Sequence, residues 1–275
     1  MKKLLTTLMA IMLTLVTAFT FTACSDTSSN NDGIVNVRTK TVTVGYTDYA
    51  PMNYTDDNGT LVGFDTELAL MVFNALGYEV RFKLIEWGQK YNELNGGTID
   101  CIWNGFTANS SDDGTPRSEL VDFSYYYMQN AQCIIRKSTT ANADNLDNFA
   151  TTSVAYEAGS AGQSYVEDSI TAEIYKKPVS SQMDAVQAVN TGTADYAVID
   201  ILLAESLAGK GDYADIVINT GIEIPVEYYA IGFKTGSELT AKVNTMLEAY
   251  AKIGYLTDLA KKYGLETKVL TNFNA

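Results

Sequence analysis

Three polar residues stand at positions where they could bind a small charged molecule. Arg117 is the sole arginine between Arg81 and Arg136. Ser160 lies where a strand-like run turns into a helical one, and Asp200 directly follows the strand-like run 196–199. A guanidinium binds a carboxylate through its planar fork, helix N-terminal amides attract the same group, and an opposing acid binds an ammonium. Together these residues suit a zwitterion.

Each of these residues also has a structural interpretation. Arg117 could be a surface arginine that faces Asp112 or Asp113. Ser160 could cap a helix, a role that is compatible with ligand binding, and Asp200 could cap the helix expected from residue 201. We favour the binding roles because an acid at 200 would oppose Arg117 across a cleft.

The composition excludes several other chemistries. The chain has no histidine, so it lacks the usual Ser-His-Asp and Cys-His nucleophile arrangements and most zinc sites. The net charge of −14 argues against nucleic acid, whose phosphates require Lys and Arg. We expect no metal, no cofactor and no nucleic-acid partner. Cys101 and Cys133 each lie in an apolar, strand-like run, and the sequence leaves open whether they are buried thiols or a disulfide.

The N-terminus predicts export. Lys2 and Lys3 precede an uncharged stretch that ends in Phe21-Thr22-Ala23-Cys24, which resembles a bacterial lipobox apart from Phe21 in place of the usual Leu. We expect a signal peptide at 1–23, lipid attachment at Cys24 and a flexible, lipid-anchored tether at 24–40. A membrane-spanning helix is the alternative, which the several Thr residues weaken, and a simple secreted form is another. The mature protein would stay outside the cytoplasm, anchored to the membrane.

From residue 41 onward the pattern alternates between strands and helices. Such alternation predicts an α/β fold with mainly parallel sheets flanked by helices. We expect strands at 42–45, 79–85, 99–103, 153–156 and 196–199 and helices at 64–76, 87–94, 163–168, 183–189, 201–207, 239–252 and 256–263. Two extended runs, 123–135 and 220–233, predict two hinge crossings between a discontinuous lobe 1 (41–127 plus 227–275) and lobe 2 (128–226).

Several motifs, in order, resemble the amino-acid-binding family of ABC importer receptors. This family has a two-lobed periplasmic-binding-protein-like fold and includes histidine-, glutamine- and lysine/arginine/ornithine-binding proteins. The motifs are Tyr49-Ala-Pro51, Gly63-Phe64-Asp65, Ile85-Glu-Trp87, Gly97-Thr-Ile-Asp100, Val121-Asp-Phe-Ser124, Glu157-Ala-Gly159-Ser160, Gly192-Thr-Ala-Asp195 and the C-terminal stretch 255–264. One departure stands out: the loop before Arg117 is longer than in the family and lacks a Glu beside Arg117.

The resemblance assigns roles to further residues. Tyr49 and Trp87 would be aromatic walls of the cleft, while Asn104, Gly105 and Thr107 would hold the ammonium and carboxylate of the ligand. Arg117 would clamp the carboxylate, with Ser160 beside it, and Asp200 would pair with the ammonium. Glu157 and Tyr46 would line the region of the ligand side chain, where an acid suits a cationic or amide-donor group.

The resemblance implies a monomeric receptor that captures a free, polar amino acid and delivers it to an ABC permease and its ATPase. No catalysis is expected. One alternative is a catalytic, dehydratase-like relative, for which Glu157 is the acid we would nominate. Another is a sensor ectodomain, which would need a true membrane-spanning helix.

Overall fold

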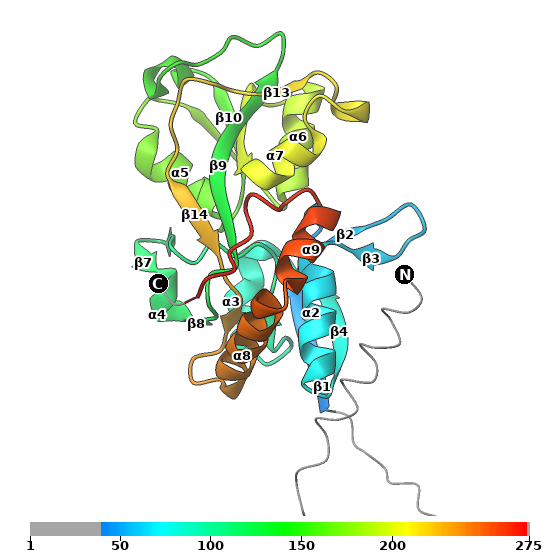
Figure 1. Ribbon diagram of the computed structural model, residues 1–275. Coiled ribbons are helices and arrows are strands. Elements are labelled where there is room, and N and C mark those ends of the chain that lie inside the picture. Colours follow the sequence, from blue (N-terminus) through cyan, green and yellow to red (C-terminus); the bar gives the residue numbers. More distant parts are fainter. Residues whose placement is uncertain (1–39, 274–275) are drawn as a thin grey trace, which may run out of the picture. The chain divides into compact units, whose positions relative to one another are not determined.

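Two β-sheets organise residues 40–273, which are the residues that the computed structural model describes. The expected signal peptide, the lipid attachment at Cys24 and nearly all of the expected tether lie outside them. Figure 1 shows the two sheets at opposite ends of the long strand β9 (Met128–Lys137). The fold is therefore the predicted two-lobed α/β arrangement.

The first sheet carries parallel strands at one side and antiparallel strands at the other. Its order is β4-β1-β5-β15-β8, with β1 parallel to β4 and β5 and with β15 antiparallel to β5 and β8. Its elements, here called the first lobe, are β1 (Lys40–Tyr46), α2 (Phe64–Ala75), β4 (Tyr78–Leu84), η1 (Trp87–Gln89), α3 (Lys90–Asn95), β5 (Cys101–Ile102), α4 (Arg117–Leu120), β8 (Asp122–Phe123), β15 (Gly232–Phe233), α8 (Glu238–Lys252) and α9 (Tyr255–Lys262).

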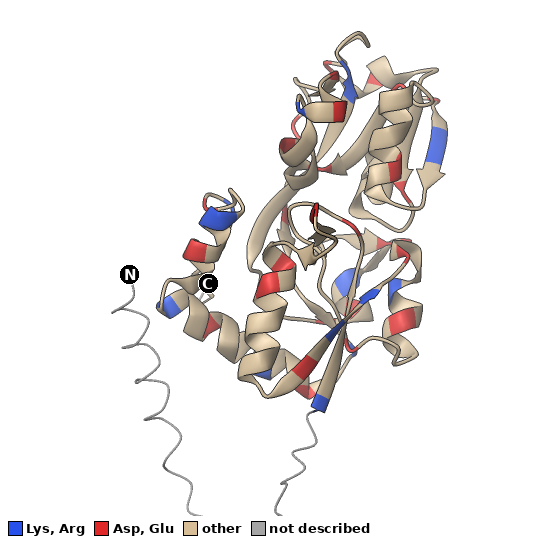
Figure 2. Cartoon of the chain, turned by 90° about the vertical axis from the view of Figure 1, so that its right-hand side faces the viewer, with Lys and Arg blue, Asp and Glu red and all other residues tan. Residues whose placement is uncertain are grey.

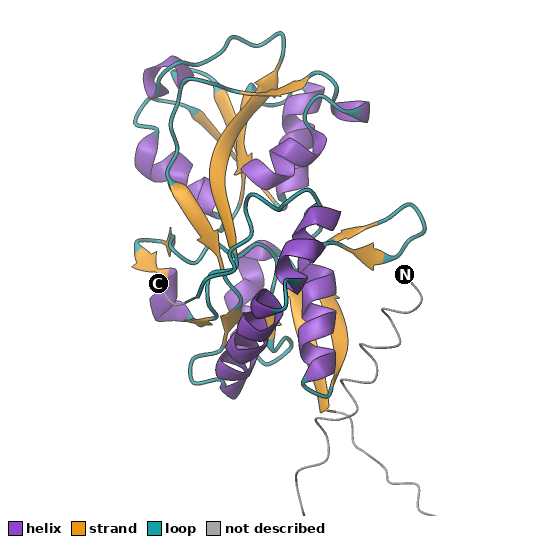
Figure 3. Ribbon diagram, viewed as in Figure 1, coloured by secondary structure: helices purple, strands orange, loops and turns teal. Residues whose placement is uncertain are grey.

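The second sheet has the order β11-β10-β12-β9-β13. β10 is parallel to β11 and β12, whereas β9 is antiparallel to β12 and β13 because it enters from the other lobe. The elements of this second lobe are β9, η2 (Leu146–Phe149), β10 (Ser153–Glu157), α5 (Ala161–Ser169), β11 (Tyr175–Val179), α6 (Gln182–Thr191), β12 (Tyr196–Asp200), α7 (Ile201–Leu207), η3 (Gly211–Tyr213) and β13 (Ile216–Ile218). Helices flank both sheets (Figure 3).

Two segments lead from one lobe to the other side by side. β14 (Val226–Tyr229) pairs antiparallel with the start of β9, with Glu227 opposite Asn130 and Tyr229 opposite Met128. Figure 1 shows this two-stranded connection between the sheets. β9 pairs with β12 of the second lobe, and Tyr229 of β14 forms a bridge to Thr107 of the first lobe. Side chains on this connection therefore lie next to both lobes.

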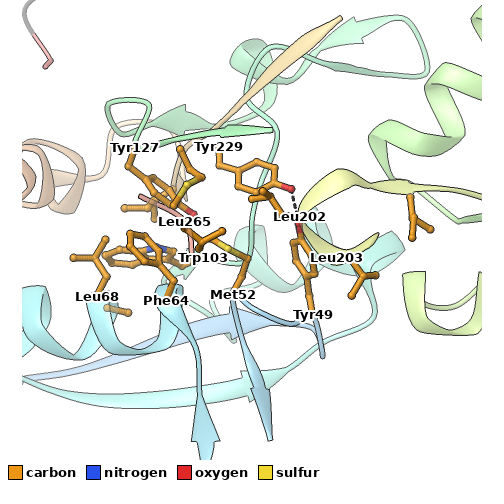
Figure 4. Close-up of a cluster of buried hydrophobic side chains, with 14 of the residues drawn as sticks. Tyr49, Met52, Phe64, Leu68, Trp103, Tyr127, Leu202, Leu203, Tyr229 and Leu265 are labelled. Atoms are coloured by element: carbon orange, nitrogen blue, oxygen red, sulfur yellow. Dashed lines mark hydrogen bonds between the residues drawn. The ribbon is translucent and has the colours of Figure 1, made fainter. Parts of the chain in front are cut away.

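The Gly-Phe-Asp motif forms the start of α2. Gly63 has φ 126°, and a Cβ there would lie 2.1 Å from the carbonyl oxygen of Met52, so only glycine fits. Phe64 then enters the core beside Trp103 and Tyr127 (Figure 4). Further along α2, Phe73 is fully buried in the core, whereas Met71 is 38% exposed.

Three short features had no counterpart in the predicted elements. β11 is the edge strand of the second sheet. It contains Pro178 and two lysines, as edge strands often do, and so lacks a clear alternation of apolar and polar residues. β2 (Tyr54–Thr55) and β3 (Leu61–Val62) form one hairpin, and β6 (Ser111–Asp112) and β7 (Thr115–Pro116) form another. The second is the lengthened loop before Arg117. Its two-residue turn, Asp113 (φ 50°) and Gly114 (φ 77°), is a type that suits hairpins.

The described residues show the state of the two cysteines and the distribution of charged side chains. Cys101 and Cys133 are buried, free thiols on β5 and β9, and burial raises the pKa of each well above its ordinary value. Within 40–273, no cluster of three or more His, Cys, Asp or Glu side chains is suited to a metal, and every helix is too short or too polar to traverse a bilayer. Acidic and basic residues are spread over the elements of both lobes (Figure 2).

Candidate functional site

A polar cavity lies where the carboxyl ends of β5, β10 and β12 meet. This is the edge at which open α/β sheets bind ligands. A water-sized sphere can occupy only about 20 Å³ inside it, which is room for about one water molecule, so the walls lie close together in this structure. Its walls come from both lobes and consist of Thr47, Trp87, Asn104, Gly105, Thr107, Arg117, Gln132, Glu157, Ser160, Ala161, Gln182 and Asp200.

Arg117 supplies the positive charge of the wall, and its side chain is 1% exposed. It begins α4 directly after the β6–β7 hairpin. NH1 donates to the carbonyl of Thr107 at 3.0 Å, and the guanidinium lies 5.1 Å from the ring centre of Phe106. These contacts fix the plane of the guanidinium, which is one of the groups that line the cavity.

Asp112 on the inserted hairpin is the counterion of Arg117. Its Oδ1 accepts from Nε of Arg117 at 2.9 Å and lies 2.8 Å from NH2, and its Oδ2 lies 3.1 Å from Nζ of Lys90. Burial alone would raise the pKa of Asp112, but the charges of Arg117 and Lys90 outweigh it and hold the pKa below its ordinary value. Arg117 therefore does face Asp112, although in a buried position and not at the surface.

Lys90 and Arg117 of the first lobe converge on one carbonyl of the second lobe. Nζ of Lys90 donates to the oxygen of Gly159 at 2.8 Å, and NH2 of Arg117 donates to it at 3.3 Å. Nearby, Oγ of Ser164 donates to the carbonyl of Ser111 at 2.8 Å. Lys90 is 2% exposed, and burial followed by the charge of Arg117 lowers its pKa to about 8. The lobes are thus hydrogen-bonded to each other along this rim.

Asp200 lies opposite Arg117 and is held by three amides. Oδ1 accepts from Asn130 at 2.6 Å and from Gln132 at 2.7 Å, and Oδ2 accepts from Gln182 at 2.5 Å. Its side chain makes no cap hydrogen bond to α7. Burial raises the pKa of Asp200 above its ordinary value, with the amide hydrogen bonds opposing that shift.

Glu157 ends β10 inside the cavity and is 3% exposed. Its Oε1 has no hydrogen-bond partner within residues 40–273. Burial, reinforced by the negative charge of Asp200, raises the pKa of Glu157 to about 8, while the positive charges of Lys90 and Arg117 oppose this rise. A buried acceptor without a donor is costly, and a donor that arrives with a ligand would satisfy it.

The floor of the cavity is set by Gly105, which has φ 56°. Its N–H donates to Asp65 of the Gly-Phe-Asp motif at 2.8 Å, and that carboxylate also accepts from Tyr127 at 2.9 Å. A Cβ on Gly105 would lie 2.6 Å from the ring of Tyr49 and 2.9 Å from that of Tyr229. The hydroxyls of those two tyrosines are 2.6 Å apart (Figure 4). The motif therefore supports the backbone that faces the ligand space.

The structure brings eight of the ten sequence-predicted ligand residues to the cavity wall: Trp87, Asn104, Gly105, Thr107, Arg117, Glu157, Ser160 and Asp200. Ser160 also accepts from the N–H of Gln163 at 3.1 Å as the cap of α5, so the two roles coexist. Tyr49 and Tyr46 are not among the lining residues. Tyr49 is buried beneath Gly105, and Tyr46 packs edge-on against Phe82.

Sequence reasoning missed four lining residues, Thr47, Gln132, Ala161 and Gln182. Gln132 could have been predicted from the spacing of polar residues in β9. Asn130 and Gln132 are two residues apart in an otherwise mostly apolar strand, and both are buried. Because side chains alternate along a strand, both lie on one face. Gln182 offered less, since a glutamine at the start of a helix is unremarkable in sequence.

A two-lobed α/β chain with a polar cavity between its lobes has the architecture of a receptor that encloses a small solute. Residues 42–266 match the model of the bacterial extracellular solute-binding proteins, family 3. The chain belongs to that family.

Individual relatives agree with this assignment. The arginine-binding extracellular protein ArtP of Bacillus subtilis (strain 168) is 27% identical over 96% of this chain and 98% of its own length. An ancestral arginine-binding protein bound to arginine superposes with a TM-score of 0.74 at 28% identity, covering 81% of this chain and 97% of its own. An ancestral amino acid-binding protein, AncCDT-1, a precursor of cyclohexadienyl dehydratase, gives 0.71 at 27% identity, covering 81% and 95%.

Proposed function

We propose that this chain is the substrate receptor of an amino-acid ABC importer and captures a free amino acid with a cationic side chain. The unpartnered Oε1 of Glu157 in the cavity wall carries the proposal. Arg117 would bind the α-carboxylate, Asp200 the α-ammonium, and Glu157 the N–H donors of the side chain. Trp87 would provide the flat wall.

The charge balance around the cavity supports a cation. Two buried cations, Arg117 and Lys90, are already paired with Asp112. Asp200 and Glu157 remain on the wall, and Glu227 lies beside Asp200 through shared amide donors. Asp112 leaves one positive charge of Arg117 and Lys90 unbalanced, whereas Asp200, Glu157 and Glu227 would carry three negative charges when ionised. A cationic side chain favours the ionised acids and reduces this excess, which a zwitterion with no net charge would not do. Relatives that bind arginine fit the same proposal.

Capture would proceed by closure of the two lobes about β9 and β14. Residues 41–127 and 227–275 would move as one lobe and residues 128–226 as the other. The closed monomer would dock on a membrane permease that works with an ATPase. Attachment through a lipid on Cys24, outside the described residues, would keep the receptor near that permease.

A thermal-shift screen of the purified, mature chain against the twenty common amino acids tests the proposal. Arginine, lysine or histidine should stabilise it, because a ligand at 100 times its Kd adds roughly 2.7 kcal/mol of stability. Titration calorimetry on Glu157→Gln should then show weaker binding of the cationic ligand and a smaller preference over glutamine. A screen in which neutral or acidic amino acids alone stabilise the wild-type chain would overturn the cationic assignment.

A catalytic role is the second candidate, and one observation favours it. Glu157 has a pKa of about 8, which suits a general acid, and one structural relative is a precursor of a dehydratase. Carboxylic acids with a cyclohexadienyl ring, as the name of that dehydratase indicates, are the substrates to assay by chromatography. Release of product with multiple turnovers would favour the enzyme, and stoichiometric retention of an unchanged amino acid would favour the receptor.

A further inference from the structure

Glu227 lies on β14, the second of the two connecting strands, and belongs to none of the sequence motifs described above. Its Oε2 accepts from Gln132 at 2.9 Å, from Asn130 at 3.1 Å and from the hydroxyl of Thr107 at 3.3 Å. Gln132 and Thr107 line the cavity. Glu227 is therefore linked to the cavity through side chains of both connecting strands and of the first lobe.

The amides that bind Glu227 are the same ones that bind Asp200. Asn130 lies 2.6 Å from Oδ1 of Asp200 and Gln132 lies 2.7 Å from it. An amide nitrogen carries two hydrogens, so each can serve both carboxylates at once. Asp200 and Glu227 thus form one hydrogen-bonded acid pair that spans β12 and β14.

Asp200 is buried and Glu227 is half-buried, and two neighbouring acids in such a site do not both ionise readily unless a cation lies nearby. Burial and then the charge of Asp200 raise the pKa of Glu227 to about 7, and the charge of Arg117 opposes this rise. The groups that face the pair from the surrounding elements are Arg117 of α4, Glu157 of β10, and the hydroxyls of Tyr49 and Tyr229. Among them, Arg117 is the cation, and Asp112 already pairs with it.

We propose that Glu227 is a positioning residue for solute capture: through Asn130 and Gln132 it is coupled to Asp200, the carboxylate that receives the ammonium of the solute, and one proton leaves this acid pair when the ammonium arrives. The proton passes to bulk water, and no covalent bond of the solute changes. This inference rests on the proposed function, because it assumes an amino-acid ligand. It adds that capture is linked to pH through a residue on the hinge.

The sign of the linkage follows from the exchange. Below a pH of about 7 a proton must leave the pair before the ammonium binds, so affinity rises with pH and levels off once the pair is ionised. One released proton corresponds to a change of about tenfold in affinity per pH unit. A solute without an ammonium, such as the α-keto analogue of arginine, should release no proton from the pair.

The test is calorimetric titration of the mature chain with L-arginine between pH 5.5 and 8.5, in buffers of different ionisation enthalpy, which counts the protons released. The wild-type chain should release protons near pH 6.5. Glu227→Gln keeps an acceptor for Asn130 and Gln132 but cannot titrate, so it should release fewer protons. Its affinity should match that of the wild type at pH 5.5 and fall about 30-fold below it at pH 8.5, because one proton is linked to binding over the roughly 1.5 pH units between 5.5 and about 7.

Two further variants separate the outcomes. Glu223→Gln, on an exposed residue of the same segment, should match the wild type throughout. Glu227→Asp retains a carboxylate and should keep the proton release even where its affinity is weaker, so a folding defect in Glu227→Gln would not decide the matter.

Identical proton release and pH profiles for wild type, Glu227→Gln and Glu227→Asp would overturn this inference and leave the proposed function standing. Failure of the wild-type chain to bind arginine, lysine or histidine at any pH would overturn the proposed function, and this inference with it.

Discussion

The carboxylate of Asp112 lies 2.8 Å from the guanidinium of Arg117, and both belong to one short stretch around the β6–β7 hairpin. The acid binds the Nε and NH2 edge while NH1 donates to the carbonyl of Thr107. The hairpin that lengthens the loop before Arg117 therefore also orients its guanidinium, through Asp112. The same carboxylate also forms an ion pair with Lys90.

Replacing Arg117 with Ala should weaken amino-acid binding at least about 100-fold, because a buried, pre-oriented guanidinium is the principal partner proposed for the ligand carboxylate. Calorimetry measures the affinity, and circular dichroism checks the fold. Arg81→Ala, at an arginine whose side chain is 64% exposed, is the matched control and should leave affinity unchanged. Undiminished affinity in Arg117→Ala would remove Arg117 from the site.

Asp112→Asn should destabilise the chain by about 3 kcal/mol, since it leaves two buried cations without their counterion. The pKa of Asp112 is lowered in the folded state, so its contribution is present at neutral pH and is lost as pH falls through the acid range. Urea unfolding at pH 7 and pH 3.5 should show the difference between wild type and variant shrinking at the lower pH. Asp113→Asn, on the exposed turn of the same hairpin, should be neutral at both.

Glu157→Gln should stabilise the ligand-free chain at alkaline pH. The folded-state pKa of about 8 lies above the ordinary value, so the contribution of this group is complete below about pH 4.5 and is lost as pH rises through about 8. Thermal unfolding at pH 9 should show the variant to be more stable by about 2 kcal/mol, with little difference at pH 5. Glu173→Gln, at an exposed position, is the control. Equal pH profiles for all three proteins would contradict the burial of an ionisable Glu157.

Gly105→Ala should cost about 3 kcal/mol and also weaken binding, because the new methyl group would meet the rings of Tyr49 and Tyr229. Gly97→Ala separates backbone strain from this clash. Gly97 also has a positive φ, 73°, but open space around its Cβ, so we expect a loss of about 1 kcal/mol and unchanged binding. Urea unfolding and calorimetry on both variants provide the comparison. Similar losses of stability in Gly105→Ala and Gly97→Ala would show that the rings of Tyr49 and Tyr229 can shift to make room for the methyl group.

Much of the site was predictable because its residues follow buried strands. The apolar runs that end at Glu157, Asp200 and Asn104 are readable in sequence, and in open α/β sheets such strand ends meet at one edge. Ser160 was predictable for the same reason, since a strand-to-helix turn needs a capping hydroxyl. The order of the helices followed from their apolar spacing, and α7 begins and ends where the pattern predicts.

What escaped prediction depends on contacts between distant segments. Tyr49 looks like a cleft aromatic in sequence, but its partner Tyr229 lies 180 residues away and holds it under Gly105. The inserted hairpin reads as a polar loop, and the ion pairs of Asp112 come from the tertiary fold. Glu227 lies in an extended run whose pairing with Asn130 no local pattern specifies.

Asn130 and Gln132 donate to Asp200, and they belong to β9, the strand that runs from one lobe to the other. A change in the twist of that strand would therefore move the amides of Asn130 and Gln132, which hold the carboxylate proposed to bind the solute. Under the proposed closure, one ten-residue strand both contacts the ammonium site and bends between the lobes, so binding and movement involve the same residues. A fluorophore attached beside this strand would report occupancy directly.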